Sequence, residues 1–373
     1  MRLVSIAKCQ PGMRLGKRIY NEEGIVLLAE HVELTAPLIT RLKELGFQAV
    51  YIEDKRTDDI VIPELVSEET RMRALREVRS HFRRIMDRGI RTKLSGGAFF
   101  DKAFRDVVSM IIDDLSGHKD AMIMLTDMTA KDHYLYQHSL NVCVYATMLG
   151  LSSQMPREEL HVLAMGALLH DIGKTQIPLE MLRKMGKLSK EEFELMKTHA
   201  EHGFRILKDE PNISLIAAHC AFQHHERLDG SGYPRGLKGE EIHDYARLIA
   251  VVDSYDAMTS HRVYRNAMLP HQALEILFAG AGTLYDKSKI EQFRNKVAIY
   301  PIGHEVTLNT GETGVVVDLN LNSPHRPIVR ILQNAAGEQI KSPYEIDLSR
   351  NPSVVITAVR DVDVVWQDME LSV

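Results

Sequence analysis

The sequence is poor in cysteine and contains no long apolar run. Its three cysteines, Cys9, Cys143 and Cys220, are widely spaced and form no CxxC pair, so we expect reduced thiols and no disulfide framework. The first apolar stretch is broken at Lys8, too early for the h-region of a signal peptide. No later run approaches the roughly 18 residues that a transmembrane helix needs. These absences predict a cytoplasmic protein that does not associate with a membrane.

Positive charge in excess is also missing. The formal net charge is −5, and the composition is ordinary for a globular protein, with 45% hydrophobic and 26% charged residues. A negative net charge argues against binding to polymeric nucleic acid, although a local basic pocket remains compatible with it. The length of 373 residues allows two or three domains.

Histidine, by contrast, is abundant and concentrated. The chain has 17 histidines, and thirteen of them fall between His118 and His271. A single histidine is most often a surface or core residue without a special role. A concentration in one segment points to metal binding, because neutral imidazole is the commonest metal ligand.

The pattern of apolar residues predicts four parts. Residues 1–62 are expected to form a small α/β regulatory unit, with strands at 15–20, 24–28 and 49–52 and a helix at 36–45. Residues 63–114 are expected to be a helical linker, whose amphipathic helix at 67–88 is a candidate homodimer contact.

In the second half of the chain, the apolar pattern changes from helical to strand-like near residue 300. Residues 115–300 have helical spacing throughout, with apolar helices at 140–149, 162–169 and 246–258 and a capping box at Ser189 and Glu192. Residues 301–373 are rich in short strand patterns, expected at 305–308, 314–317, 327–332 and 354–359. We therefore expect a mainly α protein: a helical catalytic domain, a small N-terminal α/β unit and a small β-rich C-terminal appendage.

Polar residues interrupt the apolar helices in a way that suggests a metal site. His138 lies early in one of them, His170 and Asp171 follow Ala167-Leu168-Leu169, and Asp253 follows Ile249-Ala250-Val251-Val252. Each alone could be satisfied by a neighbouring backbone group. A buried carboxylate is costly unless it is paired or bound to a metal, and one binuclear site would satisfy all of these groups together. Nitrogen and oxygen ligands without thiolates suit iron, manganese, nickel, cobalt or zinc.

These residues resemble those of a known family. The His170-Asp171 doublet, with His138 and Asp253, looks like the HD superfamily of metal-dependent phosphohydrolases. The run His224-His225-Glu226-Arg227-Leu228-Asp229-Gly230-Ser231-Gly232-Tyr233-Pro234 resembles the signature of its HD-GYP subfamily. Members are bacterial phosphodiesterases that linearise cyclic di-GMP to pGpG, and some continue to GMP. The likeness covers about residues 115–300, and the first 60 residues resemble a small domain often found ahead of HD-GYP domains.

The resemblance implies roles for individual residues. His138, His170, Asp171 and Asp253 match the ligands of one metal, with Asp171 as the bridge, and His199, His224 and His225 match ligands of the neighbouring metal. Lys174, Arg262 and Arg265 match residues that contact substrate phosphate. The alternative for the two arginines is that they are solvated surface residues. The expected cofactors are two divalent ions, iron or manganese, whose shared hydroxide attacks the phosphodiester; Asp171 and Lys174 are the catalytic residues.

The same resemblance implies partners and one departure. The loop of Gly232, Tyr233 and Pro234 is expected to shape the pocket's edge or to bind a GGDEF-type diguanylate cyclase. Members with three metals carry a glutamate four residues before the first histidine ligand, where this chain has Tyr134. Tyrosine is a poor substitute for a carboxylate ligand, so we expect two metals and pGpG as the main product.

Two rival functions stay open at this point. One is a non-catalytic signalling module that binds a nucleotide or a cyclase; the presence of every ligand in the set argues against it. The other is an HD hydrolase acting on a linear nucleotide or a different cyclic dinucleotide. The sequence does not show which residues contact the bases.

Overall fold

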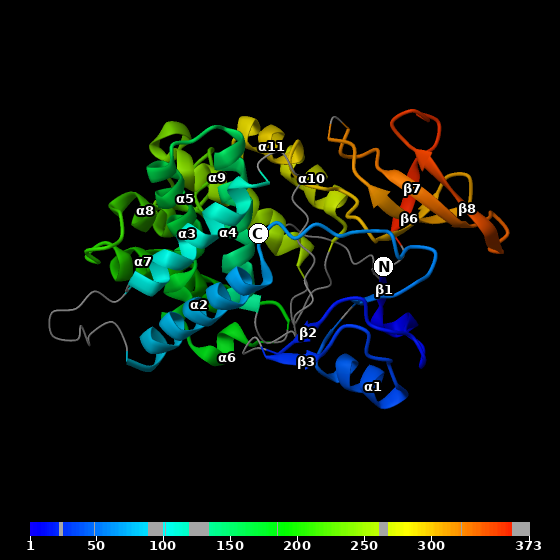
Figure 1. Ribbon diagram of the computed structural model, residues 1–373. Helices are drawn as coiled ribbons and strands as arrows, with labels where there is room; N and C mark the ends of the chain where they lie inside the picture. Colours follow the sequence, from blue (N-terminus) through cyan, green and yellow to red (C-terminus); the bar gives the residue numbers. More distant parts are fainter. Residues whose placement is uncertain are drawn as a thin grey trace.

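The computed structural model describes residues 1–21, 25–47, 49–88, 100, 102–118, 134–184, 186–260, 268–321 and 323–359. A helical body makes up most of it, and a small N-terminal unit and a C-terminal sheet lie together on one side of that body (Figure 1). The helices are α1 (Ala36–Glu44), α2 (Glu68–Arg88), α3 (Lys102–Ser116), α4 (Tyr134–Ser152), α5 (Arg157–Leu169), α6 (Leu179–Leu182), α7 (Lys190–Leu207), α8 (Leu215–Gln223), α9 (Asp244–Thr259), α10 (Pro270–Ala279) and α11 (Lys287–Arg294), with short 3-10 helices η1 (Ile6–Lys8), η3 (Ile172–Gln176) and η4 (Gly239–Glu241). The strands are β1 (Arg2–Ser5), β2 (Ile19–Tyr20), β3 (Val26–Leu28), β4 (Ala49–Ile52), β5 (Glu305–Leu308), β6 (Thr313–Asp318), β7 (Ile328–Gln333), β8 (Gln339–Asp347) and β9 (Ile356–Val359).

Helices α4, α5 and α9 form the centre of the helical body. Most side chains along them are buried, as expected for apolar runs with few polar breaks. Helix α4 packs on α5 and α9, and α8 packs on both α5 and α9. Helix α7 begins with the predicted capping box, in which the Ser189 hydroxyl accepts from the Glu192 amide and the Glu192 carboxylate accepts from the Ser189 amide. The mainly helical fold class is confirmed.

The amphipathic helix α2 buries its apolar face inside this chain. Val78, Phe82 and Ile85 are buried, and α2 packs on α3 and α4. The apolar stripe that suggested a dimer contact is thus already covered, and only the polar face of α2 is left for a partner. The sequence also predicts a loop at 91–97 after this helix, and that segment falls outside the described residues.

The N-terminal unit is built around an antiparallel pair of strands, of which the sequence predicted β4 at 49–52 and missed β1. Strand β1 pairs with β4, with Arg2 opposite Ile52 and Ser5 opposite Ala49. The expected strand at 15–20 is shorter than predicted: only Ile19–Tyr20 pairs with β3, while Leu15 forms an isolated bridge to Ile52. The unit has its own apolar core, which includes Leu34, Phe47 and Val50.

The C-terminal appendage is a five-stranded antiparallel sheet in the order β8-β7-β6-β5-β9. Four of its strands fall where the sequence predicted them, within one or two residues, and β8 was missed. Val306, Val315 and Val329 are buried in the same apolar cluster as the helical body. The sheet is therefore packed onto the body and shares its core.

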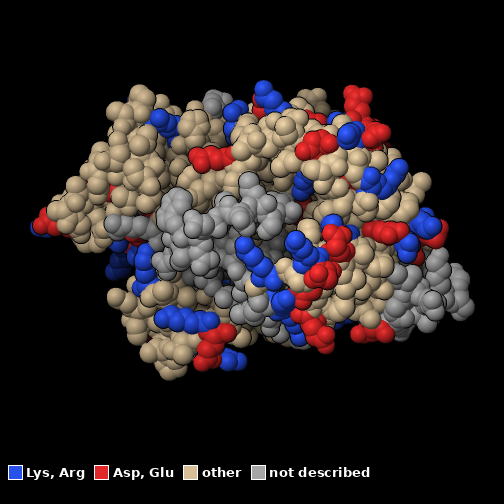
Figure 2. All heavy atoms as spheres, turned by 180° about the vertical axis from the view of Figure 1, so that it is seen from behind, with Lys and Arg blue, Asp and Glu red and all other residues tan. Residues whose placement is uncertain are grey.

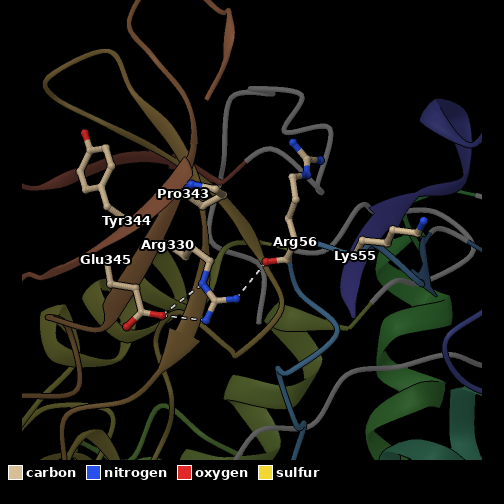
Figure 3. Close-up of a pocket in the computed structure, with 6 residues that line it drawn as sticks. All are labelled: Lys55, Arg56, Arg330, Pro343, Tyr344 and Glu345. Atoms are coloured by element: carbon tan, nitrogen blue, oxygen red, sulfur yellow. Dashed lines mark hydrogen bonds and ion pairs between the residues drawn. The ribbon is translucent and has the colours of Figure 1, made fainter. Parts of the chain in front are cut away.

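Polar contacts join the N-terminal unit to this sheet, although their sequences are far apart. The Arg330 guanidinium reaches Asp59 at 2.6 Å. It also reaches Glu345 at 2.7 Å and the carbonyl oxygen of Arg56 at 2.9 Å (Figure 3). The Leu3 amide donates to the Gly303 carbonyl at 2.8 Å. These contacts hold the two parts side by side against the helical body.

On the face seen in Figure 2, acidic and basic side chains are interspersed among the described residues. Within the described part of the chain, no helix is both long and apolar enough to cross a membrane.

Candidate metal centre

The predicted ligands come together from five helices at the centre of the body. His138 lies on α4, His170 caps α5, Asp171 precedes η3, His199 lies on α7, His224 and His225 follow α8, and Asp253 lies on α9. All are buried except His225, which is partly exposed. Every predicted ligand that the sequence singled out is thus found in one cluster.

Two glycines allow the close packing on which this cluster depends. A Cβ atom on Gly173 would lie 1.8 Å from the carbonyl oxygen of His199, and one on Gly203 would lie 3.4 Å from the Gly173 nitrogen. The backbone of η3 therefore rests directly on α7. This contact brings His199 next to Asp171, which begins η3.

One group of ligand atoms surrounds the Oδ2 atom of Asp171. The Nε2 atom of His138 lies 3.0 Å from Oδ1 of Asp253 and 3.7 Å from Oδ2 of Asp171. The Nε2 atom of His170 lies 3.4 Å from Oδ2 of Asp171 and 3.7 Å from Oδ1 of Asp253. These four residues are the ones that the family resemblance assigned to one metal.

A second group surrounds the other oxygen of the same carboxylate. The Nε2 atoms of His199 and His224 lie 3.5 and 3.8 Å from Oδ1 of Asp171, and 3.3 Å from each other. His225 completes a set of four residues whose ligand atoms all lie within 4.8 Å of one another. The carboxylate of Asp171 thus faces a different set of imidazoles with each of its oxygens.

Hydrogen bonds of the Nδ1 atoms set the orientation and the tautomer of these histidine rings. Nδ1 of His170, His199 and His224 lies 2.7, 2.7 and 3.0 Å from the carbonyl oxygens of Ala167, Met196 and Ala221 respectively. A carbonyl oxygen can only accept, so each Nδ1 carries the proton. In the neutral ring, Nε2 then turns its lone pair toward the centre, the orientation that a metal ligand requires.

Protonation of His199 and His224 would not resolve the close approach of their Nε2 atoms, because both rings resist taking up a second proton. Burial lowers the pKa of His199 to about 4, and burial together with the neighbouring His170 and His199 holds the pKa of His224 well below its usual value. These rings stay neutral at pH 7 and place two lone pairs 3.3 Å apart. A cation between them would turn that repulsion into coordination.

The carboxylate side of the centre attracts positive charge. Burial opposes protonation of His170, but the negative charges of the nearby Asp171 and Asp253 outweigh it and raise the pKa of His170 to about 10. Burial likewise disfavours ionised Asp171, yet Lys174 and His170 hold its pKa well below the usual range. The two shifts show that the buried carboxylates and their cationic neighbours stabilise each other's charged forms, and bound metal ions would supply positive charge to the same carboxylates.

The residues fit divalent metal ions by distance and by chemistry. Adjacent ligand atoms around an ion with bonds of about 2.1 Å lie roughly 3.0–3.4 Å apart, close to the 3.0–3.8 Å found here. Nε2 of His170 and Oδ1 of Asp171 are buried without a hydrogen-bond partner among the described residues, as ligand atoms are before a metal binds.

The predicted phosphate-binding residues are placed less completely. The Lys174 ammonium lies 2.6 Å from Oδ2 of Asp171, at the centre's edge. Arg262 and Arg265 lie outside the described residues, as does the side chain of Tyr134.

The structure adds a polar partner that the sequence reading missed. Asp256, one helical turn after Asp253, accepts from Nδ1 of His138 at 2.7 Å and from the amide nitrogen of Asn141 at 2.9 Å. Its side chain is 2% exposed. The available signal was the matched spacing: Asp253 and Asp256 on one helix, His138 and Asn141 on another, each pair three residues apart and hence on one face.

The loop after His225 is fastened beside the centre. The buried Glu226 carboxylate accepts from the amides of Arg235 and Leu237 at 2.8 and 3.0 Å. The Tyr233 ring lies against His225, with centroids 4.7 Å apart. Burial, and then the charge of Asp253, raise the pKa of the Tyr233 hydroxyl, so the ring stays neutral at the edge of the metal centre.

A pocket of about 600 Å³ between the N-terminal unit and the C-terminal sheet is a weaker candidate. Lys55, Arg56 and Arg330 give it a basic lining (Figure 3). However, Nε, Nη1 and Nη2 of Arg330 all donate to protein oxygens, and Arg56 is held by Asp54 and Gln339. These guanidinium groups join protein parts and are not free for a ligand.

Comparison with known proteins agrees with this geometry. Residues 112–288 match the HD domain family, and residues 305–364 match a KOW domain associated with HD domains. The HD match falls within the helical body. The ligand cluster and the His224–Pro234 signature both lie within it.

Curated relatives share this domain. The chain is 34% identical to a cyclic di-GMP phosphodiesterase of Pseudomonas aeruginosa over 66% of this chain and 59% of that protein. It is 44% identical to a cyclic di-GMP phosphodiesterase response regulator of Xanthomonas campestris over 38% of this chain and 36% of that protein. A 3′3′-cGAMP-specific phosphodiesterase of Vibrio cholerae is 38% identical over 42% of this chain and 36% of that protein. The chain thus spans less than two thirds of these relatives.

Proposed function

We propose that this protein is a metal-dependent phosphodiesterase that hydrolyses cyclic di-GMP to pGpG. The observation that carries the proposal is the position of Asp171, whose two carboxylate oxygens face separate sets of histidine Nε2 atoms at 3.4–3.8 Å. A carboxylate between two imidazole sets is the arrangement of a binuclear hydrolytic centre. The relatives named for cyclic di-GMP hydrolysis support the substrate.

In this proposal each residue has a definite task. Asp171 would contribute to holding both ions, His138, His170 and Asp253 would hold one, and His199, His224 and His225 would hold the other. Bound divalent ions would supply Lewis acidity toward the phosphate and lower the pKa of water. The Lys174 ammonium, 2.6 Å from Asp171, is placed to hold a non-bridging phosphate oxygen, and Arg262 and Arg265 would hold a further phosphate.

The two ions are proposed to be iron or manganese. The ligand set contains nitrogen and oxygen only, which suits these metals. The thiols of the same helical body do not compete, because burial raises the pKa of Cys143 and of Cys220 to about 12 and keeps both protonated.

Further expectations from the sequence belong to the same proposal. The chain is divided into a regulatory unit (1–62), a helical linker (63–114), a catalytic domain (115–300) and a β-rich appendage (301–373). The protein is proposed to be cytoplasmic. The exposed side of the Gly232–Pro234 loop is proposed as the contact for a GGDEF-type diguanylate cyclase. A homodimer would use the polar face of α2.

The test is a metal count joined to a product assay. The protein is purified anaerobically, its iron and manganese are quantified, and cyclic di-GMP, pGpG and GMP are separated after incubation. Asp171→Asn removes one bridging oxygen while keeping the side chain's shape. Asp209→Asn, at an exposed position after α7, is the matched control.

We expect about two metals per chain and turnover to pGpG in the wild type and in Asp209→Asn, and loss of both in Asp171→Asn. Tight binding of cyclic di-GMP without turnover, with iron and manganese supplied, would overturn the enzymatic proposal in favour of a receptor. Faster turnover of 3′3′-cGAMP than of cyclic di-GMP would change the substrate and keep the chemistry.

A further inference from the structure

Beside the metal centre lies a group of side chains that are not part of the ligand set. We infer that Phe193, Lys197 and Tyr233 form the subsite that binds a guanine base of the substrate. The inference rests on the proposed function, since it assigns a base contact to a cyclic dinucleotide held at the metals.

The three side chains continue outward from the ligands. The Tyr233 ring lies 4.7 Å from the His225 ring and 6.3 Å from the His199 ring, centroid to centroid. Phe193 on α7 lies edge-on to Tyr233 at 6.4 Å. The aromatic row therefore begins at two metal ligands and ends at Phe193 on the surface.

Phe193 is unusual because it is an aromatic residue that the fold leaves open. It is 37% exposed, although it lies one ring away from the buried centre. An exposed ring next to a nucleotide site is suited to stacking on a base, because every base has a flat π face. The chain's own packing leaves this part of the ring available.

Lys197 gives the subsite a base preference. Its ammonium lies 5.4 Å from the centroid of Phe193 and 5.9 Å from that of Tyr233. A lysine beside a stacked base donates well to the O6 and N7 acceptors of guanine, whereas adenine places an amino donor where guanine has O6. The ion pair of Lys197 with Glu194 at 2.6 Å is easily exchanged, since Glu194 is 70% exposed.

The experiment separates the base from the rest of the nucleotide. GMP, AMP and ribose 5-phosphate are titrated by calorimetry into the full chain loaded with Mn²⁺. GMP and ribose 5-phosphate differ only in the base, so the ratio of their dissociation constants measures the base subsite. The variants are Phe193→Ala, Phe193→Trp and Lys197→Met.

Two matched controls come from the same helix. Leu195 is 44% exposed, and its position two residues after Phe193 turns it to the other side of α7. Lys208 is exposed at the end of α7. Leu195→Ala and Lys208→Met should both behave as the wild type.

We expect the wild type to bind GMP more tightly than ribose 5-phosphate, and Phe193→Ala to weaken GMP binding by about tenfold, a typical loss for a stacking ring. Phe193→Trp should keep the preference, and Lys197→Met should lose the preference for GMP over AMP. Equal affinity of the wild type for GMP and ribose 5-phosphate, or unchanged GMP binding by Phe193→Ala, would overturn the subsite. An unchanged GMP preference in Lys197→Met would overturn the guanine assignment. Base-dependent binding without hydrolysis of cyclic di-GMP would sink the proposed activity alone.

Discussion

The carboxylate of Asp256 lies 2.7 Å from Nδ1 of His138, both being almost fully buried. This contact holds the imidazole so that Nε2 points at Asp253 and Asp171. Asn141 fixes the other Asp256 oxygen at 2.9 Å. Asp256 touches no ligand atom of the centre, so its role is to position a ligand.

Asp256→Asn should weaken metal binding without unfolding the protein. An amide presents only one acceptor to the two donors, His138 and Asn141, so one of them loses its partner. Loss of such a supporting contact typically costs 10–100-fold in metal affinity. Competition with a fluorescent chelator measures the affinity, and thermal unfolding monitors the fold. The Ser260 hydroxyl makes a longer contact of 3.3 Å to the same carboxylate, so Ser260→Ala is the control. Wild-type affinity in Asp256→Asn would contradict the role.

Gly173→Ala should damage the fold and the centre together. The new Cβ would meet the carbonyl oxygen of His199 at 1.8 Å, and neither atom can move away unless its backbone moves. We expect a loss of about 3 kcal/mol or more in the free energy of unfolding, at the upper end of overpacking costs. Chemical denaturation followed by circular dichroism measures this loss.

Gly117→Ala is the control for this prediction, since among the described residues its Cβ would meet no atom closer than 3.5 Å. If Gly173→Ala were as stable as the control, the close contact of η3 with α7 would not exist as described.

The sequence predicted the parts of this structure that depend on local pattern. Long apolar runs predicted α4, α5 and α9, because a helix that is buried on most sides has few polar residues in its sequence. The capping box at Ser189 predicted the start of α7, because it depends only on two residues three positions apart. The ligand set could be named because a family signature carries it, and the fold brings those residues into one cluster.

Elements that depend on distant partners were harder to find. Strand β1 has only four residues and becomes a strand by pairing with β4, almost fifty residues away; no alternation can be read in so short a segment. The spacing of Asp256 from Asp253 places both on one helix face, but only the folded contact with α4 shows that His138 is its partner. The exposure of Phe193 beside Tyr233 likewise depends on the tertiary fold.

Arg330→Lys should loosen the N-terminal unit from the C-terminal sheet. Arg330 holds Asp59 through two nitrogens at 2.6 Å and also reaches the Arg56 carbonyl, a geometry that a lysine cannot reproduce. The global cost should be about 1 kcal/mol, since Asp59 is largely exposed. The local effect is sharper: the Leu3 amide, bonded across to Gly303, should exchange its hydrogen faster.

Arg41→Lys is the matched control for this measurement. Arg41 pairs with Glu44 within α1 and is 66% exposed, so its replacement breaks no contact between the two parts. Equal exchange of the Leu3 amide in both variants would show that Arg330 does not hold the parts together.

His304 should make the stability fall as the solution becomes acidic. Both of its ring nitrogens are buried without a hydrogen-bond partner among the described residues, and burial lowers its pKa to about 4. The unfolded chain takes up a proton near pH 6.5, whereas the folded chain does so only near pH 4. The folded state therefore binds fewer protons in this window, so its stability is complete above pH 6.5 and decreases as the pH falls toward 4.

Between pH 7 and pH 5 this residue alone should cost about 2 kcal/mol, because each unit of pKa difference is worth about 1.4 kcal/mol. His304→Leu removes the titrating group and keeps an apolar side chain in its place. Urea unfolding at pH 7 and pH 5 gives the free energy of unfolding of the wild type and of the variant. The decrease in this free energy from pH 7 to pH 5 should be about 2 kcal/mol smaller in the variant. An identical pH dependence in both proteins would mean that His304 is protonated in the fold at pH 5, and that its ring has access to water or to a partner.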